Sequence, residues 1–488
     1  MFIKITGLLL LLLIAGIPLF LHIDSLPFRL WDESRLATNA YEMHKNGNFI
    51  VTYYDGHPEM WNTKPPLMIW MQVFFIKMIG FTELAVRLPS AIAGLLTCAV
   101  LVFFSLQYFK SLLPGAFACI VLVTTNGYID THAIRTGDYD GLLALFTTLF
   151  AFAGFLYAEY NYKKWLIVFF AALILAVLTK SVQPLLFLPG IAIYFLFIKK
   201  MKLLFSKSFL TGALLAVVVI AAYYITRELM NSGYLLAIWN NELGGRYFNA
   251  LEENDAGALY YISRMEGYLF PYWIWLLPVG IISGLFSKDE KLRRLTIFTF
   301  IVSATYFIFI TISKTKLYWY TVPLFPLLSM QIGIFLYQVY GYIKQINHLS
   351  RYHVIPLLIV SMVFVYPYYT IFRKVYHPKE YEWDKMYPLS GFLQDAYHGK
   401  SSMDNVVIVY RDYDQHLKVY TDALKDKGQH IYFKQPDNLL EGDTVMASES
   451  EVYKTIESKY DFNLIKNERD VKVYLIKKRR AGTLDAAQ

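Results

Sequence analysis

PPLMIWMQVFFI, residues 65–76, is the stretch on which the arrangement of the whole chain depends. It is apolar, but Lys77 ends it after twelve residues, whereas a helix that crosses the hydrocarbon of a bilayer needs about 20. This length is typical of an interfacial or re-entrant helix. If the stretch crossed the membrane, every later loop would change sides. We therefore expect residues 23–87 to form one long extracytoplasmic loop, with two amphipathic helices on the membrane surface.

The composition around this stretch is that of a membrane protein. Of the 488 residues, 56% are hydrophobic and 17% are charged, whereas soluble chains carry about 25% charged residues. Uncharged apolar runs recur along the first three quarters of the chain, which argues against a soluble multidomain enzyme. We predict a polytopic α-helical membrane protein of about eleven transmembrane helices, at residues 5–21, 88–108, 112–129, 142–158, 165–178, 184–198, 209–225, 268–285, 295–312, 317–340 and 354–372.

The first of these runs also has the pattern of a secretory signal peptide, because Lys4 precedes a Leu-rich run that ends at Leu21. No small-x-small cleavage site follows, since the chain continues through His22-Ile23-Asp24. We therefore predict a retained first helix.

Basic residues set the predicted orientation. They gather in short loops on one side of the predicted spans, at Lys110, Lys163, Lys164, Lys199, Lys200, Lys202, Lys207, Lys288, Lys291, Arg293, Arg294, Lys344 and Arg351. The positive-inside rule makes that side cytoplasmic, which places the N-terminus inside and the C-terminal tail outside. Because the formal charge of +8 is spread over these loops, it forms no single basic face and does not indicate a nucleic-acid partner.

The parts outside the spans are two long loops and a tail. A second outside loop covers residues 226–267, and residues 1–378 form the predicted transmembrane module. Residues 379–478 are predicted to form a small extracytoplasmic α/β domain, because VVIVY at 406–410 and VKVYLI at 471–476 are typical of strands. Helical patterns near 414–427 and 449–459 lie between them. Residues 479–488 are predicted to be a disordered tail. The two cysteines, Cys98 and Cys119, lie in apolar runs and offer no disulfide framework or zinc site.

Unusual charged residues gather on the predicted outer face, where ionisable groups near hydrocarbon indicate function. In Trp31-Asp32-Glu33-Ser34-Arg35, the carboxylates either cap a helix or supply a general base beside the membrane. In Asn62-Thr63-Lys64-Pro65-Pro66, the prolines start a helix, and Lys64 beside its free N–H groups also makes an anion site.

Further charges follow the same distribution. Arg135 and the Asp138-Tyr139-Asp140 motif stand at the outer end of a predicted span, and Asp-x-Asp is a weak signal for a divalent cation. Lys180, Lys314 and Lys316 stand outside, against the positive-inside bias, and an anionic lipid phosphate would explain them.

Glu242 and Arg246 lie four residues apart in the second outside loop. They either form a plain helical ion pair, or Arg246 contacts a phosphate. The chain has no P-loop, HExxH or GxSxG element, which leaves ATPase, zincin and α/β-hydrolase interpretations without support.

Together, these motifs resemble the protein O-mannosyltransferase and lipid A aminoarabinose transferase superfamily over roughly residues 1–345. The resemblance rests on the order and spacing of Asp32-Glu33-Ser34-Arg35, Lys64-Pro65-Pro66, Arg87-Leu88-Pro89-Ser90, Arg135 to Leu143, Leu178-Thr179-Lys180, Glu242 to Arg246, and Ser313-Lys314 through Tyr320, Pro323 and Pro326. Members are GT-C glycosyltransferases that use polyprenyl-phosphate sugars. One departure is Thr63, where aminoarabinose transferases carry Glu before the Lys-Pro pair. This departure argues against transferring a metal ligand to that position, and against lipid A as the specific acceptor.

The resemblance implies roles for individual residues. Asp32 matches the acidic residue that activates the acceptor hydroxyl, and Asp140, with Asp138, matches a second acidic position. Lys64, Arg246 and Tyr320 match positions that hold the donor phosphate. The remaining substrate-binding candidates are Glu33, Arg35, Arg135, Lys180, Glu242, Lys314 and Lys316. A divalent cation at Asp138 and Asp140 is left open.

The residues themselves fit this chemistry. A sugar linked to a lipid phosphate already has a good leaving group, so the site needs a carboxylate base and cations rather than a strong general acid. We expect a glycosyltransferase in a bacterial inner membrane that transfers a sugar from polyprenyl phosphate to an extracytoplasmic glycolipid or protein, with inversion. The alternatives are a lipid-linked sugar transporter or flippase, and a non-catalytic scaffold. Transporters tend to place polar, broken helices at the bilayer midplane, whereas the polar groups here stand at the ends of the spans.

Overall fold

The computed structural model describes residues 2–130, 132–244, 256–346, 354–378 and 388–480. The chain divides into two compact units. The first unit comprises Met1–Ile23, Ala40–Gly80 and Leu84–Tyr376, and the second comprises Asp24–Asn39, Phe81–Glu83 and His377–Gln488.

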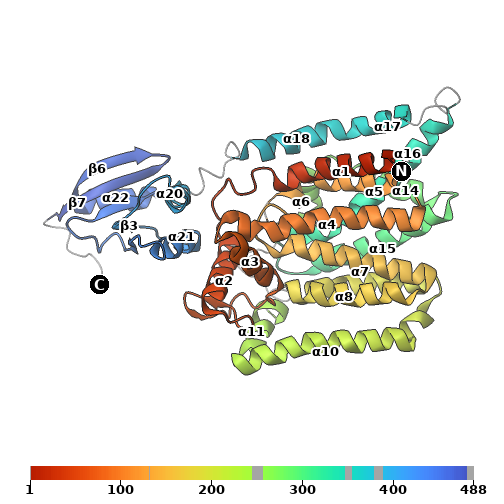
Figure 1. The fold of residues 1–488 in the computed structure, drawn as a ribbon, viewed down its shortest axis with the longest axis horizontal. Coiled ribbons are helices and arrows are strands. Elements are labelled where there is room, and N and C mark those ends of the chain that lie inside the picture. The colour runs from red at the N-terminus through yellow and green to blue at the C-terminus, as the bar shows by residue number, and fades with distance from the viewer. Residues whose placement is uncertain (1, 131, 245–255, 347–353, 379–387, 481–488) are drawn as a thin grey trace. The chain divides into compact units, whose positions relative to one another are not determined.

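The first unit is a helical bundle, in which Figure 1 shows the long helices lying side by side. Its longer helices are α1 (Phe2–Phe20), α3 (Leu67–Ile79), α4 (Glu83–Phe109, from its second residue), α5 (Leu113–Val123), α7 (Tyr139–Tyr160), α8 (Lys163–Lys180), α9 (Leu188–Phe197), α10 (Lys207–Met230), α14 (Leu276–Leu285), α15 (Glu290–Ile312), α16 (Phe325–Gln345) and α18 (Val365–Tyr376). Short helical segments join them: α6 (Asn126–Ile129), η1 (Gln183–Phe187), η2 (Met201–Phe205), α11 (Tyr234–Ile238), η3 (Trp239–Leu243), α13 (Tyr260–Arg264), η4 (Met265–Leu269), η5 (Tyr318–Leu324), α17 (Val354–Ser361) and η6 (Met362–Phe364). A two-stranded ribbon, β1 (Tyr53–Tyr54) and β2 (His57–Pro58), lies in the first long loop.

The predicted multi-pass helical architecture is confirmed. Within the described residues, six helices are long and apolar enough to cross a membrane. They are Glu83–Phe109, Tyr139–Tyr160, Lys207–Met230, Glu290–Ile312, Tyr318–Gln345 and Val354–Tyr376. Shorter apolar helices account for most of the other predicted spans, and Lys163–Lys180 accounts for the fifth.

Two predicted spans differ from the helices that form. The run 112–129 is interrupted after Val123, where α5 ends. The hydroxyls of Thr124 and Thr125 there bond back to the Ile120 and Val121 carbonyls of the preceding turn. The run 268–285 is helical as α14 only from Leu276, with η4 and turns before it.

The stretch at 65–76 forms a short helix, as its length predicts. α3 follows Pro66 and ends at Ile79. The next residue, Gly80, takes a φ of 82°, and its N–H bonds to the Ile76 carbonyl at 2.9 Å. The left-handed φ suits glycine, which has no Cβ to clash. Gln72 of α3 donates to the Val86 and Gly137 carbonyls at 3.2 and 3.0 Å. These bonds tie α3 to the start of α4 and to the loop before α7.

Close helix packing holds the bundle. A Cβ on Gly333 of α16 would lie 2.5 Å from the Pro114 carbonyl of α5, so these two helices approach as only glycine allows. The ring of Phe104 stacks on Phe152 with centroids 4.1 Å apart, which joins α4 to α7.

The second unit is built on a five-stranded sheet with the order β4-β3-β5-β7-β6. Its strands are β3 (Val406–Ile408), β4 (Ile431–Phe433), β5 (Thr444–Ala447), β6 (Tyr460–Glu468) and β7 (Val471–Arg479). β3 pairs in parallel with β4 and β5, whereas β7 pairs antiparallel with β5 and β6. The helices are α20 (Pro388–Tyr397), α21 (Gln415–Lys425) and α22 (Ser450–Lys459), together with the first half of α2 (Asp32–Asn46). The predicted strands and helices of the α/β region all form; residues 481–488 of the predicted tail lie outside the described residues.

Candidate functional site

A small cavity of about 90 Å³ in the first unit collects four of the residues predicted from the sequence. Lys64, Lys180, Glu242 and Tyr320 line it, although they are far apart in the chain. Its other walls are Val182, Gln183, Leu186, Phe309, Ile310 and Ser313. Two lysines, one glutamate and one tyrosine therefore meet at one small space whose other walls are mainly apolar.

Lys180 is held by Asp140. Its Nζ lies 2.7 and 2.6 Å from the two carboxylate oxygens, and both side chains are buried. Asp140 stands in the first turn of α7, where the helix dipole favours a negative charge, and Lys180 is the last residue of α8. An ammonium has three N–H donors, so two bonds to Asp140 leave a third that can serve a ligand in the cavity.

Lys64 enters the cavity from the loop before α3. Its Nζ lies 3.4 Å from Glu242 Oε1 and 5.5 Å from the centroid of the Tyr139 ring. The Tyr139 hydroxyl in turn accepts a hydrogen bond of 2.8 Å from the Asn62 side chain. Glu242 therefore partners Lys64, and Arg246, its predicted helical partner, lies outside the described residues.

Arg227 fixes the loop that carries Lys64. Its buried guanidinium donates to the Ile50 carbonyl at 3.0 Å, to the Thr52 hydroxyl at 3.3 Å and to the Glu59 carbonyl at 3.1 Å. Nearby, the Tyr234 hydroxyl donates to the Thr63 carbonyl at 2.7 Å. Arg227 was missed by the sequence analysis; a charge just beyond the predicted span 209–225 is the signal that could have found it.

Tyr320, in η5, is positioned through hydrogen bonds that involve η1 and α15. The Gln183 amide donates to the Tyr306 hydroxyl at 2.7 Å, and that hydroxyl donates to the Tyr320 carbonyl at 2.9 Å. The Tyr320 ring lies with its centroid 5.6 Å from Lys180 Nζ. Its aromatic face can therefore stabilise the ammonium beside the cavity.

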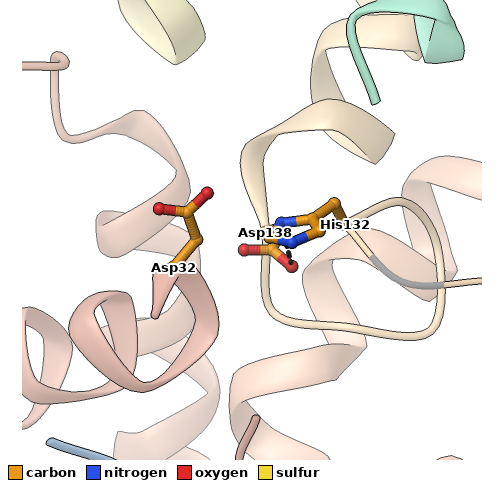
Figure 2. Close-up of side chains that lie close together, drawn as sticks. All are labelled: Asp32, His132 and Asp138. Atoms are coloured by element: carbon orange, nitrogen blue, oxygen red, sulfur yellow. Dashed lines mark ion pairs between the residues drawn. The ribbon is translucent and has the colours of Figure 1, made fainter. Parts of the chain in front are cut away.

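Asp138, the residue before α7, pairs with a histidine that the sequence analysis missed. His132 Nδ1 lies 3.6 Å from an Asp138 oxygen (Figure 2). The His132 ring stacks on Trp319, with centroids 3.8 Å apart. A carboxylate and an imidazole are both metal ligands, whereas the Asp140 carboxylate is bonded to Lys180. A divalent cation at Asp138 stays a prediction.

The other basic candidates of the first unit have different surroundings. Arg135 donates to the Pro18, Leu21 and His22 carbonyls at 3.0, 2.8 and 3.1 Å, so it caps the end of α1. Lys316 is buried and donates to the Ser313 carbonyl at 2.9 Å. Lys314 is exposed.

Asp32, Glu33 and Arg35 belong to the second unit and open α2. Asp32, also drawn in Figure 2, is the first residue of that helix. Glu33 is buried, and its carboxylate accepts a hydrogen bond of 2.8 Å from the Arg29 N–H. Glu33 thus satisfies a backbone donor just before the helix, which is a capping arrangement. Arg35 is partly buried in the first turn.

Comparisons with known proteins agree with this architecture. The model of a family described as dolichyl-phosphate-mannose-protein mannosyltransferase matches residues 63–225, which include Lys64, Asp138, Asp140 and Lys180. An uncharacterized protein of Aquifex aeolicus is 23% identical over 333 residues, covering 68% of this chain and 63% of that one. The putative mannosyltransferase YycA of Bacillus subtilis is 29% identical over 161 residues, covering 32% of this chain and 22% of that one. The chain thus spans less than two thirds of the length of these relatives.

A solved structure shows the fold. The crystal structure of ArnT from Cupriavidus metallidurans bound to undecaprenyl phosphate superposes with a TM-score of 0.71. It is 16% identical, and the match covers 96% of this chain and 97% of that one. The chain therefore has the fold of the GT-C glycosyltransferases, and the predicted resemblance to that superfamily is confirmed. The matches also support a multi-pass membrane protein.

Proposed function

We propose that this protein transfers a sugar from a polyprenyl-phosphate donor to a hydroxyl or phosphate of an extracytoplasmic glycolipid or protein. The observation that carries the proposal is the cavity at which Lys64 and Lys180 converge. The description of the family that matches residues 63–225 names a dolichyl-phosphate sugar. The ArnT structure holds undecaprenyl phosphate. Both names point to a lipid phosphate as the ligand for such a pair of ammonium groups.

The two ammonium groups at the cavity can contact a phosphate that becomes more negative during the reaction. Lys64 and Lys180 are each paired with a carboxylate, Glu242 and Asp140, so the four groups together are close to neutral. The carboxylates hold the ammonium groups in place before the ligand binds, and preorganised cations stabilise developing charge without reorganisation. We assign Lys64, Lys180, Tyr320 and Arg246 to the donor phosphate, with Lys314 and Lys316 as further basic groups.

In the proposed reaction, an oxygen of the acceptor attacks the anomeric carbon of the sugar. The acceptor O–H gives its proton to the Asp32 carboxylate as the new C–O bond forms. The bond between the anomeric carbon and the phosphate oxygen breaks, and polyprenyl phosphate leaves with the electron pair. A single displacement of this kind inverts the anomeric centre. We assign Asp140 to holding Lys180, and Asp138 to the sugar or to a divalent cation.

A transfer assay tests the proposal. Purified protein in liposomes, given a radiolabelled polyprenyl-phosphate sugar and an acceptor lipid or peptide, should label the acceptor. Asp32→Asn should abolish the labelling, whereas Asp24→Asn, an exposed carboxylate in the same loop, should not. If both variants label the acceptor as fast as the wild type, Asp32 is not the base. If the labelled lipid only crosses the bilayer, the chain is a transporter.

We further propose a bacterial inner membrane, with the N-terminus in the cytoplasm and the cavity and C-terminal domain on the periplasmic face. A cysteine at the exposed position of Lys314, with the buried Cys98 and Cys119 as background, should react with an impermeant maleimide in intact spheroplasts. Protection there, with reaction restored by detergent, would reverse the orientation.

A further inference from the structure

The C-terminal α/β domain packs with short segments from the N-terminal part of the chain. Residues Asp24–Asn39 and Phe81–Glu83 belong to the same compact unit as His377–Gln488. The contacts between these segments gather on the loop before α21, on α21 itself and on α20. We propose that the domain holds the turn that carries Asp32, and that Tyr413 and Tyr420 are its positioning residues.

The first contact lies immediately before Asp32. The Trp31 ring stacks on Tyr413, with centroids 4.5 Å apart and planes within 4°. Trp31 has a φ of 67°, in the left-handed region that a bulky side chain rarely adopts. Such a backbone persists only where the surroundings hold it. The stack with Tyr413 is therefore a restraint on the residue from which α2 starts.

The second contact lies three residues further back. The Phe28 N–H donates to the Tyr420 hydroxyl at 3.1 Å, and the two rings lie with centroids 5.1 Å apart. The Tyr420 hydroxyl donates in turn to the Glu83 carboxylate. One hydroxyl of α21 thus links the backbone before Asp32 to the first residue of α4.

Glu83 is the centre of a buried network. Besides Tyr420, its carboxylate accepts from the Gln394 amide at 3.0 Å and from His398 Nε2 at 2.9 Å. Burial makes these bonds costly to lose, since a desolvated carboxylate without its donors is strongly disfavoured.

The third contact lies beyond Asp32 on α2. The Gln415 amide donates to the Thr38 hydroxyl at 2.5 Å, between two buried side chains. The Thr38 hydroxyl also donates to the Ser34 carbonyl at 2.9 Å, inside the same helix. The turn of Asp32 is therefore restrained on both sides by Tyr413, Gln415 and Tyr420.

The place of these contacts on the domain is informative. Tyr413 follows β3, at the carboxyl end of the parallel strands β3, β4 and β5, which is where open α/β sheets bind their ligands. Here that position faces Trp31 of the same chain. The domain thus uses the ligand-binding edge of its fold to hold the turn before α2. The step from holding this turn to turnover rests on the proposed role of Asp32.

The test compares Tyr413→Ala and Tyr420→Phe in the full chain with two matched variants. Tyr413→Phe keeps the aromatic stack and should retain more protection and more activity than Tyr413→Ala. Tyr432→Ala removes an exposed tyrosine from β4 of the same domain and should change nothing. The first readout is amide hydrogen exchange of residues 26–38, which should quicken by roughly tenfold in Tyr413→Ala and Tyr420→Phe.

The second readout separates positioning from general damage. In the two loosened variants kcat should fall by about tenfold, while the Kd for undecaprenyl phosphate stays within about twofold, because Lys64 and Lys180 are untouched. Unchanged exchange in residues 26–38 would overturn the inference, whatever the activity. Faster exchange with unchanged kcat in both variants would mean that the domain only supports the fold of this turn. It would overturn the positioning role of Tyr413 and Tyr420. Absence of transfer in the wild type would count against the proposed function alone, since the exchange experiment needs no substrate.

Discussion

The ammonium of Lys180 lies within 2.7 Å of both carboxylate oxygens of Asp140. The two residues stand on neighbouring helices, one at the start of α7 and the other at the end of α8. Both side chains are almost fully buried. The pair is therefore both a part of the helix packing and a wall of the cavity.

Removing one member of this pair should lower the stability of the folded protein. An uncompensated buried charge costs about 3–5 kcal/mol, so Lys180→Ala and Asp140→Ala should each lower the Tm in detergent by several degrees. The double variant should recover part of that loss, because no unpaired charge remains. It should stay inactive if Lys180 holds the donor phosphate. A double variant that regains both stability and activity would show that the pair is only structural.

Lys64 should contribute to donor affinity. A charge-assisted hydrogen bond is worth about 1.5–3 kcal/mol, so Lys64→Gln should raise the Kd for undecaprenyl phosphate by roughly 10- to 100-fold. Lys77→Gln is the matched control, since Lys77 stands exposed in the last turn of α3, the helix that Lys64 precedes. Both affinities can be measured by microscale thermophoresis in nanodiscs. Equal values for the two variants would remove Lys64 from the donor site.

Arg227 should be required for the shape of the loop before α3. Its guanidinium serves three acceptors at once, a fork that lysine does not reproduce. Arg227→Lys should therefore lower the Tm nearly as much as Arg227→Met. Faster hydrogen exchange should appear in residues 50–63 of both variants. A wild-type Tm in Arg227→Lys would mean that the positive charge matters there and the three hydrogen bonds of the guanidinium do not.

Most of the long helices and the short helix at 67–79 could be predicted because each depends on a local apolar run and on its length. Lys64 and Lys180 could be predicted as candidates because their charges stand where such runs begin or end. Their convergence with Glu242 and Tyr320 on one cavity is a tertiary fact. The sequence indicates it only through the order of motifs shared with a family.

Other features have no local pattern at all. Arg227 bonds to Ile50, which lies 177 residues earlier in the chain, and Trp31 stacks on Tyr413 near the other end. The Asp-Tyr-Asp at 412–414 has the composition of a surface loop, and only the structure shows what its tyrosine contacts. Contacts between residues so far apart in the chain are decided by tertiary packing. Neither the periodicity nor the composition of the sequence predicts them.

The second unit should lose stability in mild acid through His416. This side chain is buried on α21, and burial lowers its pKa to about 4 from the ordinary 6.5. Because the folded pKa is depressed, the unfolded state takes up the proton first as the pH falls. The stabilisation is complete above about pH 6.5 and is lost towards pH 4. Two and a half pKa units correspond to about 3 kcal/mol.

The measurement is hydrogen exchange of α21 in the intact protein between pH 7 and pH 4, corrected for the intrinsic rate. In the wild type the protection should fall steadily over that range. In His416→Phe, which keeps a ring beside Tyr410, the part of this pH dependence above about pH 5 should disappear, because ordinary carboxyl groups titrate below that pH. His430→Phe is the control: His430 is exposed beside Asp404, so this variant should keep the wild-type slope. A slope that persists in His416→Phe would place the acid-sensitive group elsewhere, because an already neutral ring cannot be titrated.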